Sequence, residues 1–248
     1  MRPSFFPLWQ QAGKPVPRQA VSVNTGRQSE ARMAGQGKLV LATFNAGKVA
    51  EFRQLLAALR LELASLADMG SQQPLAEGGH SLADNARQKA TAWARRLGQW
   101  ALGDDTGLEV EALGGAPGIH TARFAGPGAT PEANRRRLLE QLAGVRLEDR
   151  RAQFVCHLAL ADPSGTVRAE SRGRCRGRIR LEEAGQRGFG YDCLFEIIEY
   201  HRTLAELGPA ARQLLSHRAR ALQQLLPRLA ELMHSGQWAA AVESPRRK

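Results

Sequence analysis

The sequence predicts an α/β protein built on a mixed sheet, and three observations support this. A buried-strand pattern at Lys38–Ala42 runs into the loop Thr43–Gly47 and then into apolar residues at helical spacing, as α/β proteins often begin. The second half holds consecutive strand patterns joined by short turns, which indicates an antiparallel stretch. The composition, 43% hydrophobic and 24% charged, is typical of a folded protein with a sizeable core.

The individual elements follow from apolar periodicity and from residues that start helices. Ser81 with Asp84 resembles a capping box, Thr130 precedes a proline at the first helical position, and Ser216 precedes a dense apolar helical pattern. Because Pro227 lies inside that last pattern, we expect it to kink or split the helix. After the opening unit, the expected elements are strands at Leu61–Leu66, Trp100–Gly103, Leu108–Ala112, Phe154–Ala161, Thr166–Arg172 and Arg178–Leu181, with helices from Ser81 to Leu97, from Thr130 to about Gly144 and from Ser216 onward.

The net charge of +11 is spread unevenly along the chain. Residues 1–36 carry five basic side chains against Glu30, a net +4, and residues 236–248 carry a net +2. The domain expected at 37–235 therefore holds +5, which suits a polyanionic small molecule. We expect residues 1–36 to be a disordered extension and 236–248 a loosely ordered basic tail. Met33 is an alternative start of translation.

Several classes of protein are disfavoured. No apolar run reaches the roughly 18–20 residues that span a membrane. The three cysteines are widely spaced and form neither a disulfide framework nor a zinc pattern, so a reducing cytosol is expected. The chain also lacks the G-x-S-x-G pattern of many acyl-transfer enzymes and the Walker A loop.

The segment Thr43–Lys48 joins the first strand to the first helix. A helix N-terminus offers free backbone N–H groups and a partial positive charge, both of which suit phosphate. Lys48 adds a full charge, and Asn45 can both donate and accept hydrogen bonds. The spacing alone nevertheless favours a simple turn with a surface lysine.

Asp104 and Asp105 are expected directly after a buried strand. Paired carboxylates near a core are costly unless something neutralises them, and Mg²⁺ is a common answer. A solvated turn is an equally good explanation of the pair. Glu77, which precedes the helix that carries Asn85 and Lys89, belongs to a second group that can hold a metal or satisfy the helix start.

Two further segments carry polar and aromatic side chains together. In 188–192 (G-F-G-Y-D), Phe189 can stack on a base and Asp192 can contact its edge, although the segment alone better fits a tight turn with a buried aromatic. In 216–218 (S-H-R), His217 and Arg218 can bind an anion or a carbonyl group.

Taken together and in this order, the motifs resemble the inosine/xanthosine triphosphate pyrophosphatase family. The resemblance covers Lys38 to about Leu232 and is carried by T-F-N-A-G-K (43–48), E-G-G-H-S-L-A-D-N-A-R-Q-K-A (77–90), G-D-D-T-G-L-E-V (103–110), L-G-G-A-P-G-I-H-T-A-R-F-A-G (113–126), G-F-G-Y-D (188–192) and L-S-H-R-A-R-A-L (215–222). It implies an elongated, two-lobed α/β fold with a central cleft, usually as a cytoplasmic homodimer. It also implies Mg²⁺-dependent hydrolysis of ITP, dITP or XTP to the nucleoside monophosphate and pyrophosphate, which removes these nucleotides from the pool.

The resemblance also assigns roles to single residues. Glu77 and Asp105 would hold Mg²⁺ with support from Asp104, and Asp105 would accept a proton from the attacking water. The purine nucleoside triphosphate would be bound by Thr43, Phe44, Asn45, Ala46, Gly47, Lys48, Thr106, Phe189, Gly190, Tyr191, Asp192, Arg212, His217 and Arg218.

The chain departs from the family pattern at a few of these positions. Phe44 stands where the family has a small residue, Cys193 replaces a proline, and Arg212 replaces a lysine. The chemical core is intact, so we expect activity. A catalytically impaired paralogue or one of altered specificity is an alternative, as is a basic nucleic-acid-binding protein, whose binding would depend strongly on salt. The modest +5 of the domain argues against nucleic acid as a partner.

Overall fold

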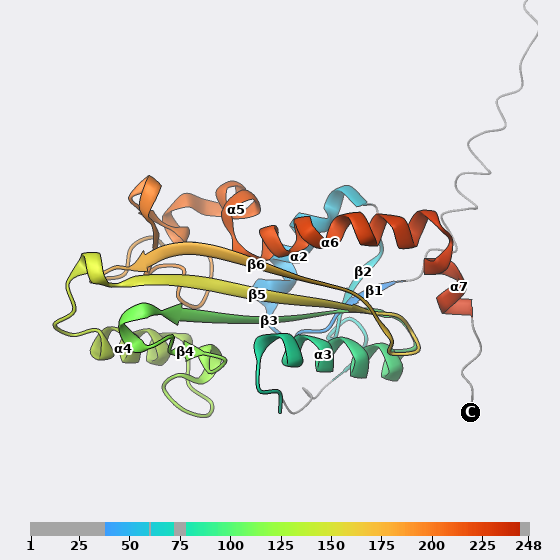
Figure 1. Cartoon of the computed structure of the whole chain (residues 1–248), viewed down its shortest axis with the longest axis horizontal. Helices are drawn as coiled ribbons and strands as arrows, with labels where there is room; N and C mark the ends of the chain where they lie inside the picture. The colour runs from blue at the N-terminus through green and yellow to red at the C-terminus, as the bar shows by residue number, and fades with distance from the viewer. Residues whose placement is uncertain (1–37, 60, 72–77, 244–248) are drawn as a thin grey trace, which may run out of the picture. The chain divides into compact units, whose positions relative to one another are not determined.

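The computed structural model describes residues 38–59, 61–71 and 78–243 (Figure 1). The N-terminal extension expected at 1–36, the alternative start at Met33 and the predicted metal ligand Glu77 lie outside the described residues. The described strands form one sheet in the order β2-β1-β3-β5-β6-β7-β8, with β4 paired to β3. The mixed α/β class predicted from the sequence is confirmed.

One end of the sheet is parallel. Strand β1 (Leu39–Leu41) lies between β2 (Leu63–Ser65) and β3 (Trp100–Val110) and runs parallel to both. Helix α2 (Ala46–Leu56) follows β1 after a short loop, as the strand–loop–helix pattern predicted. Because β1 is only three residues long, it accompanies β3 as far as Leu102 and no further.

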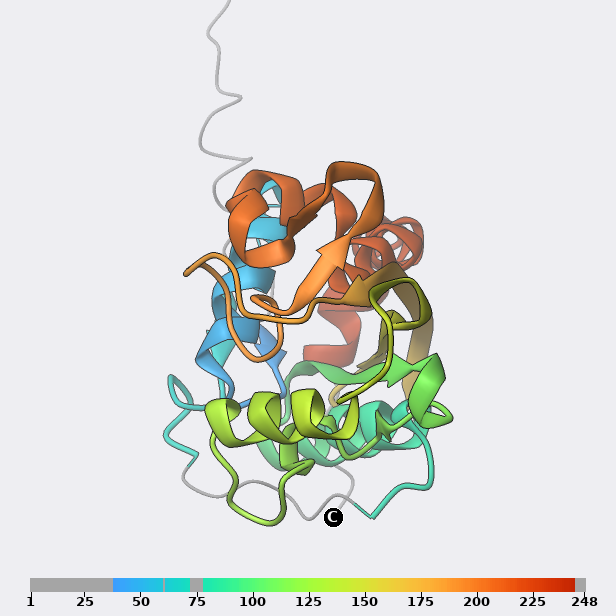
Figure 2. The ribbon, with the colours of Figure 1, turned by 90° about the vertical axis from the view of Figure 1, so that its left-hand side faces the viewer.

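The rest of the sheet is antiparallel. Two long strands, β5 (Arg151–Ala161) and β6 (Val167–Ile179), continue the sheet from β3. The shorter strands and helices around them are β4 (Pro117–Gly118), α4 (Pro131–Gln141), β7 (Phe195–Ile197), β8 (Arg202–Thr203) and α5 (Leu204–Leu215). Seen from the end that carries them, α5 lies above the strands and α4 below them (Figure 2).

Two sequence predictions in this region are wrong. Trp100–Gly103 and Leu108–Ala112 are not separate strands, because β3 pairs with β5 without a break from Ala101 to Val110. Asp104 and Asp105 therefore lie in the middle of a strand and not in a turn after one. Likewise, the two expected strands at Thr166–Arg172 and Arg178–Leu181 are one continuous strand, β6.

The long helices cover the two faces of the sheet. Helix α3 (Leu82–Leu97) packs on one face and α6 (His217–His234) on the other (Figure 1). Gly103 and Gly173 allow this close packing, because a β-carbon at either position would collide with a backbone carbonyl oxygen of α3 or α6. The N-caps predicted from sequence are confirmed: the side chains of Ser81, Thr130 and Ser216 accept hydrogen bonds from the third residue beyond each.

Polar residues divide the apolar core on the α6 face. One cluster includes Trp100, Leu102, Leu158, Leu222 and Leu225, and a second, toward α4 and α5, includes Leu108, Val110, Leu138, Phe154 and Phe195. Asp104 and Thr106 alternate onto this face of β3 between the two clusters. The division places the polar segment of β3 where a central cleft was expected.

Of the two outcomes expected at Pro227, a kink or a split, the split does not occur: α6 continues to His234, because its apolar residues on both sides of Pro227 are buried in the core. The C-terminal boundary of the domain differs from the prediction. Beyond the expected domain boundary at 235, Gln237–Glu243 forms helix α7, and Trp238 is 2% exposed. The ring of Trp238 stacks on Trp100 with 4.3 Å between centroids, so the folded domain extends past residue 235.

Among the described helices, none combines the length and the apolar character needed to cross a membrane.

Candidate active site

A pocket opens at the edge of β3, beyond the end of β1. On this edge β3 pairs with β1 up to Leu102 and with β4 from Leu108, so the described strands leave residues 103–107 uncovered. The cavity has a volume of about 580 Å³, which suits a small-molecule ligand. Its lining comes from the loop before α2, from α3, from β3, from residues 119–134, from the segment 189–192 and from the start of α6.

One wall of this pocket is formed by the segment Thr43–Lys48, which joins β1 to α2 and includes the first residues of that helix. Asn45 caps α2 by accepting a hydrogen bond from the backbone N–H of Lys48, at 3.1 Å, and its own N–H donates to Thr43 Oγ1 at 3.2 Å. The Asn45 side chain thus fixes the start of helix α2 at the wall of the pocket. The ammonium group of Lys48 forms an ion pair with Asp104.

Asp104 is enclosed by cations and does not line the pocket. Its side chain is 1% exposed, and it contacts Lys48, Arg218 at 3.3 Å and Cys156 Sγ at 3.2 Å. Burial opposes ionisation of this carboxyl group, but Lys48 and Arg218 hold its pKa well below the usual range. The predicted support of a metal by Asp104 stays a prediction, and its carboxylate, unlike that of Asp105, does not line the pocket.

Asp105 lies on the opposite face of β3, toward α3. Lys89 Nζ donates to its Oδ1 at 2.6 Å, and Asn85 Nδ2 donates to its Oδ2 at 3.1 Å. Burial raises the pKa of Asp105, and Lys89 and Lys48 offset part of this effect. In contrast to Asp104, Asp105 lines the pocket, next to Thr106.

Arg218, in the first turn of α6, joins the pocket to α2. Its Nη1 donates to Glu51 Oε2 at 2.7 Å, and Ser216 Oγ donates to Glu51 Oε1 at 2.7 Å. The guanidinium group also lies 5.1 Å from the centroid of the Phe189 ring. The start of α6 is thereby fixed to both α2 and the segment 189–192.

The segment 189–192 brings an aromatic ring and a buried acid to the pocket. Asp192 accepts a hydrogen bond from the Phe189 N–H at 3.1 Å and pairs with Arg212 at 3.2 Å, while burial raises its pKa to about 6. Tyr191 is buried and donates to the carbonyl oxygen of Thr121 at 2.9 Å. Arg212 supports Asp192 from behind and does not itself line the pocket.

His217 is buried in the pocket wall without a hydrogen-bond partner. Neither ring nitrogen contacts a donor or acceptor among the described residues, and the ring stacks on Phe154 with centroids 4.7 Å apart. Burial, together with the charge of Arg218, lowers the pKa of His217 well below its usual value, so the ring is neutral. An unsatisfied buried imidazole in a pocket wall is a group for which a ligand can supply the missing partner.

The structure thus brings together most of the residues singled out in the sequence. Lining the pocket are Thr43, Phe44, Asn45, Ala46, Gly47, Lys48, Asp105, Thr106, Phe189, Gly190, Tyr191, Asp192, His217 and Arg218. Phe44 is 40% exposed and packs edge-on against Trp93, with 6.1 Å between the ring centroids. Its ring therefore lies at the wall of the pocket and does not fill it.

Sequence reasoning missed three residues that shape the site. Glu51 holds Arg218, Lys89 holds Asp105, and Trp93 lies behind Phe44. Glu51 follows Lys48 by three residues, so both lie on one side of α2. That spacing is the only sign of Glu51 in the sequence, and it indicates a site only once α6, which carries Arg218, is known to lie beside α2.

The fold and the pocket define an α/β protein with a polar pocket between the start of α2 and the segment 189–192. The sequence model of the Ham1 family matches residues 39–228, and the chain belongs to this family. It is 45% identical over 202 residues to a dITP/XTP pyrophosphatase of Rhodopirellula baltica, covering 82% of this chain and 97% of that protein. A dITP/XTP pyrophosphatase of Geobacillus kaustophilus is also 45% identical, over 188 residues, with 76% and 92% covered.

Solved structures give the same assignment. A HAM1 protein from Coxiella burnetii is 36% identical, with a TM-score of 0.69, and the similarity covers 78% of this chain and 98% of that one. A nucleoside-triphosphatase / dITP/XTP pyrophosphatase from Mycobacterium abscessus is 40% identical, with a TM-score of 0.61 and coverage of 77% and 99%. The family predicted from the sequence motifs is confirmed.

Proposed function

We propose that this protein hydrolyses inosine and xanthosine nucleoside triphosphates to the monophosphate and pyrophosphate, with Mg²⁺ as cofactor. The observation that carries the proposal is the position of Asp105, a buried carboxylate that lines the same pocket as the loop Thr43–Lys48. The names of the relatives support the substrate class. The enzyme would remove non-standard purine nucleotides from the cellular pool.

The triphosphate would lie against the loop before α2. The first-turn N–H groups of the helix attract anions, and Lys48 adds a positive charge at the same place. Thr106 lines the pocket beside Asp105 and offers a hydroxyl group to the phosphates.

Asp105 would act as the proton acceptor for the attacking water. Its pKa is raised by burial, which makes the carboxylate a stronger base than an exposed aspartate. Lys89 and Asn85 each bond one of its oxygens, so the carboxylate is held in one orientation. A fixed and basic carboxylate in a phosphate pocket suits proton abstraction from water.

The donor set fits Mg²⁺ when it is considered with a phosphate ligand. Mg²⁺ is usually held by one or two carboxylates, with substrate phosphates and waters completing its shell. Asp105 presents one such carboxylate to the pocket, and we propose Glu77, which lies outside the described residues, as the second. The described residues contain no cluster of three or more metal-ligating side chains, so phosphate oxygens would supply part of the coordination. When bound, the metal would polarise the phosphates.

The base would lie in the part of the pocket lined by Phe189, His217 and Arg218. The neutral ring of His217 and the guanidinium of Arg218 can donate to a 6-keto group. Adenine carries an amino group there, which would leave these donors unpaired, and unpaired buried donors are strongly unfavourable. This explains a preference for inosine and xanthosine over adenosine.

A pyrophosphate-release assay tests the proposal. With Mg²⁺ present, ITP, dITP and XTP should release pyrophosphate, whereas ATP should be a much poorer substrate. GTP, which shares the 6-keto group but carries a 2-amino group, and dUTP complete the panel. Asp105→Asn should lower turnover by roughly 100-fold or more, in the range attributed to general bases. Asp162→Asn is the matched control, because Asp162 is also buried but lies in the turn after β5, outside the pocket. Undiminished turnover in Asp105→Asn would refute the proposed mechanism.

We also propose that the protein is a cytoplasmic homodimer, on the strength of the family resemblance. Sedimentation of the purified chain measures the oligomeric state, and fractionation of cells that express it measures the location.

A further inference from the structure

We propose that Asp104 is a positioning residue that holds the phosphate end and the base end of the pocket in place through two different cations. The inference rests on the proposed function and deepens it. It replaces the metal-supporting role that the sequence suggested for Asp104.

The two oxygens of Asp104 have different partners. Oδ1 accepts from Lys48 Nζ, which belongs to the phosphate loop, whereas Oδ2 faces Arg218 Nε at 3.3 Å. Lys48 is contributed by α2 and Arg218 by α6. One carboxylate therefore joins cations from two helices that start 171 residues apart in the sequence, at Ala46 and His217.

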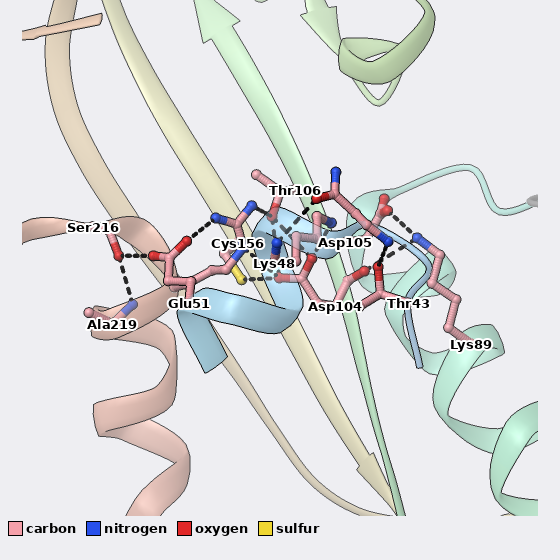
Figure 3. Close-up of polar contacts among 12 residues, drawn as sticks. Thr43, Lys48, Glu51, Lys89, Asp104, Asp105, Thr106, Cys156, Ser216 and Ala219 are labelled. Atoms are coloured by element: carbon pink, nitrogen blue, oxygen red, sulfur yellow. Dashed lines mark hydrogen bonds and ion pairs between the residues drawn. The ribbon is translucent and has the colours of Figure 1, made fainter. Parts of the chain in front are cut away.

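The side chain of Asp104 is itself held in one orientation. Cys156 Sγ donates to Oδ2 at 3.2 Å, and Thr106 Oγ1 lies 3.4 Å from both oxygens. Figure 3 shows Cys156 and Lys48 pointing toward Asp104 from the neighbouring strand and from α2. A carboxylate fixed from several directions can act as a rigid anchor for the cations around it.

The ion pairs close a buried ring with balanced charge. Glu51, one turn after Lys48 on α2, pairs with Arg218 at 2.7 Å, so the ring runs from Lys48 to Asp104, to Arg218, to Glu51 and back along α2. The side chains are between 1% and 14% exposed. Removing one charge from such a ring leaves the others buried and unpaired, so its members depend on one another.

The two cations serve different parts of the pocket. Lys48 belongs to the loop proposed to bind phosphate, and Arg218 lies against Phe189, the ring proposed to stack on the base. Asp104 does not line the pocket, so it acts on a ligand through the side chains that it contacts, the two cations and Thr106. It should therefore influence the binding of both halves of a nucleotide.

The test measures the two halves separately by calorimetric titration, with tripolyphosphate and inosine as probes. In Asp104→Asn, both affinities should fall by about 10-fold or more, because the negative charge that pairs with Lys48 and Arg218 is removed. In Lys48→Met the loss should be larger for tripolyphosphate than for inosine, because Arg218 keeps Glu51 and Asp104 as partners. In the variant that carries both Lys48→Met and Asp104→Asn, the affinity for tripolyphosphate should be no lower than in Lys48→Met alone. The affinity for inosine should still fall by the full amount that Asp104→Asn causes.

Two outcomes would overturn the proposal. If Asp104→Asn binds either probe with unchanged affinity, Asp104 does not position the cation that serves that probe. An additive effect on tripolyphosphate in the double variant would show that the loss does not pass through Lys48, as expected for general damage to the fold. If Asp104→Asn does not fold, as judged by thermal unfolding, Asp104→Glu carries the same cycle, because it keeps the charge but moves both oxygens.

These results are separable from the proposed function. Failure of the wild-type protein to release pyrophosphate from ITP would refute the proposed activity, while the binding cycle would still report on Asp104. An additive cycle in a protein that does hydrolyse ITP would refute only the role of Asp104.

Discussion

The ring of Phe189 lies against Gly47 so closely that a β-carbon at position 47 would come within 2.5 Å of it. Phe189 belongs to the segment proposed to stack on the base, and Gly47 to the segment proposed to bind phosphate, so the two parts of the proposed nucleotide site adjoin here. Any side chain at position 47 must therefore displace the ring or the loop.

Replacing Gly47 with alanine should impair substrate binding without destabilising the fold. The displaced Phe189 ring should raise KM for ITP by about 10-fold, which corresponds to about 1.4 kcal/mol. The unfolding temperature should not fall, because alanine is favoured over glycine in a helix by up to about 1 kcal/mol. Steady-state kinetics and thermal unfolding measure the two effects. With Phe189→Leu already present, Gly47→Ala should raise KM no further, and a full additional increase would contradict the steric explanation.

Replacing His217 with leucine should separate stability from activity. Both ring nitrogens are buried without a partner among the described residues, so an apolar side chain of similar size removes an unfavourable burial. We expect an unchanged or higher unfolding temperature and a KM for ITP raised by roughly 10-fold or more, since a donor to the base is lost. A clear loss of stability would mean that His217 has a structural role that its contacts do not reveal.

Asp192 should make the folded protein more stable at mildly acidic pH. Its pKa is about 6 in the folded protein against 3.8 for a free aspartate, so folding favours the protonated form. The contribution is present below about pH 4 and is lost as the pH rises through about 6. At roughly 1.4 kcal/mol per pKa unit it amounts to about 3 kcal/mol.

The measurement is urea unfolding of the wild-type protein and Asp192→Asn across that pH range. The difference between them isolates Asp192 from other groups, such as Asp104, whose lowered pKa acts in the opposite direction. The wild-type protein should lose about 3 kcal/mol relative to the variant between about pH 4 and pH 7. A constant difference would show that Asp192 does not titrate in this range.

Helix α7 should be needed for stability. A chain ending at Ser235 lacks Trp238, which is stacked on Trp100 and whose backbone carbonyl accepts a hydrogen bond from Trp100 Nε1 at 3.0 Å. Loss of a buried tryptophan typically destabilises a protein by about 3–5 kcal/mol. A chain ending at Glu243 is the control and should unfold at the same temperature as the full chain. Equal unfolding temperatures for both truncations would contradict the packing described for Trp238.

The parts of the fold that were predictable from sequence have local causes. The caps at Ser81, Thr130 and Ser216 each depend on a side chain and a backbone N–H three residues apart. The loop between β1 and α2 likewise follows from a short apolar run, a turn and a helical period.

The parts that were missed depend on distant residues. The sequence around Asp104 and Asp105 suggests a break in the strand, because two adjacent carboxylates rarely lie inside a sheet. Lys48 and Lys89, which neutralise them, come from two different helices, so their effect appears only in the folded chain. The same holds for β6, where Gly173 and Gly177 interrupt the apolar pattern although the strand is continuous.

The candidate site was predictable as a set of residues but not as an arrangement. The motifs identified which side chains meet, and the resemblance to a family supplied their order. The different positions of Asp104 and Asp105 relative to the pocket could not be predicted, because they depend on which face of β3 each residue occupies. The sequence presents the two acids as a pair, whereas in the structure Asp105 lines the pocket and Asp104 does not.

The alternation of side chains along β3 makes this strand intolerant of changes in length. An insertion or deletion of one residue between Gly103 and Leu108 would turn Asp105 toward α6 and an unsuitable neighbour toward Lys89. The strand cannot shift to compensate, because its pairing with β5 is continuous from Ala101 to Val110. Length variation in this protein must therefore be confined to the loops.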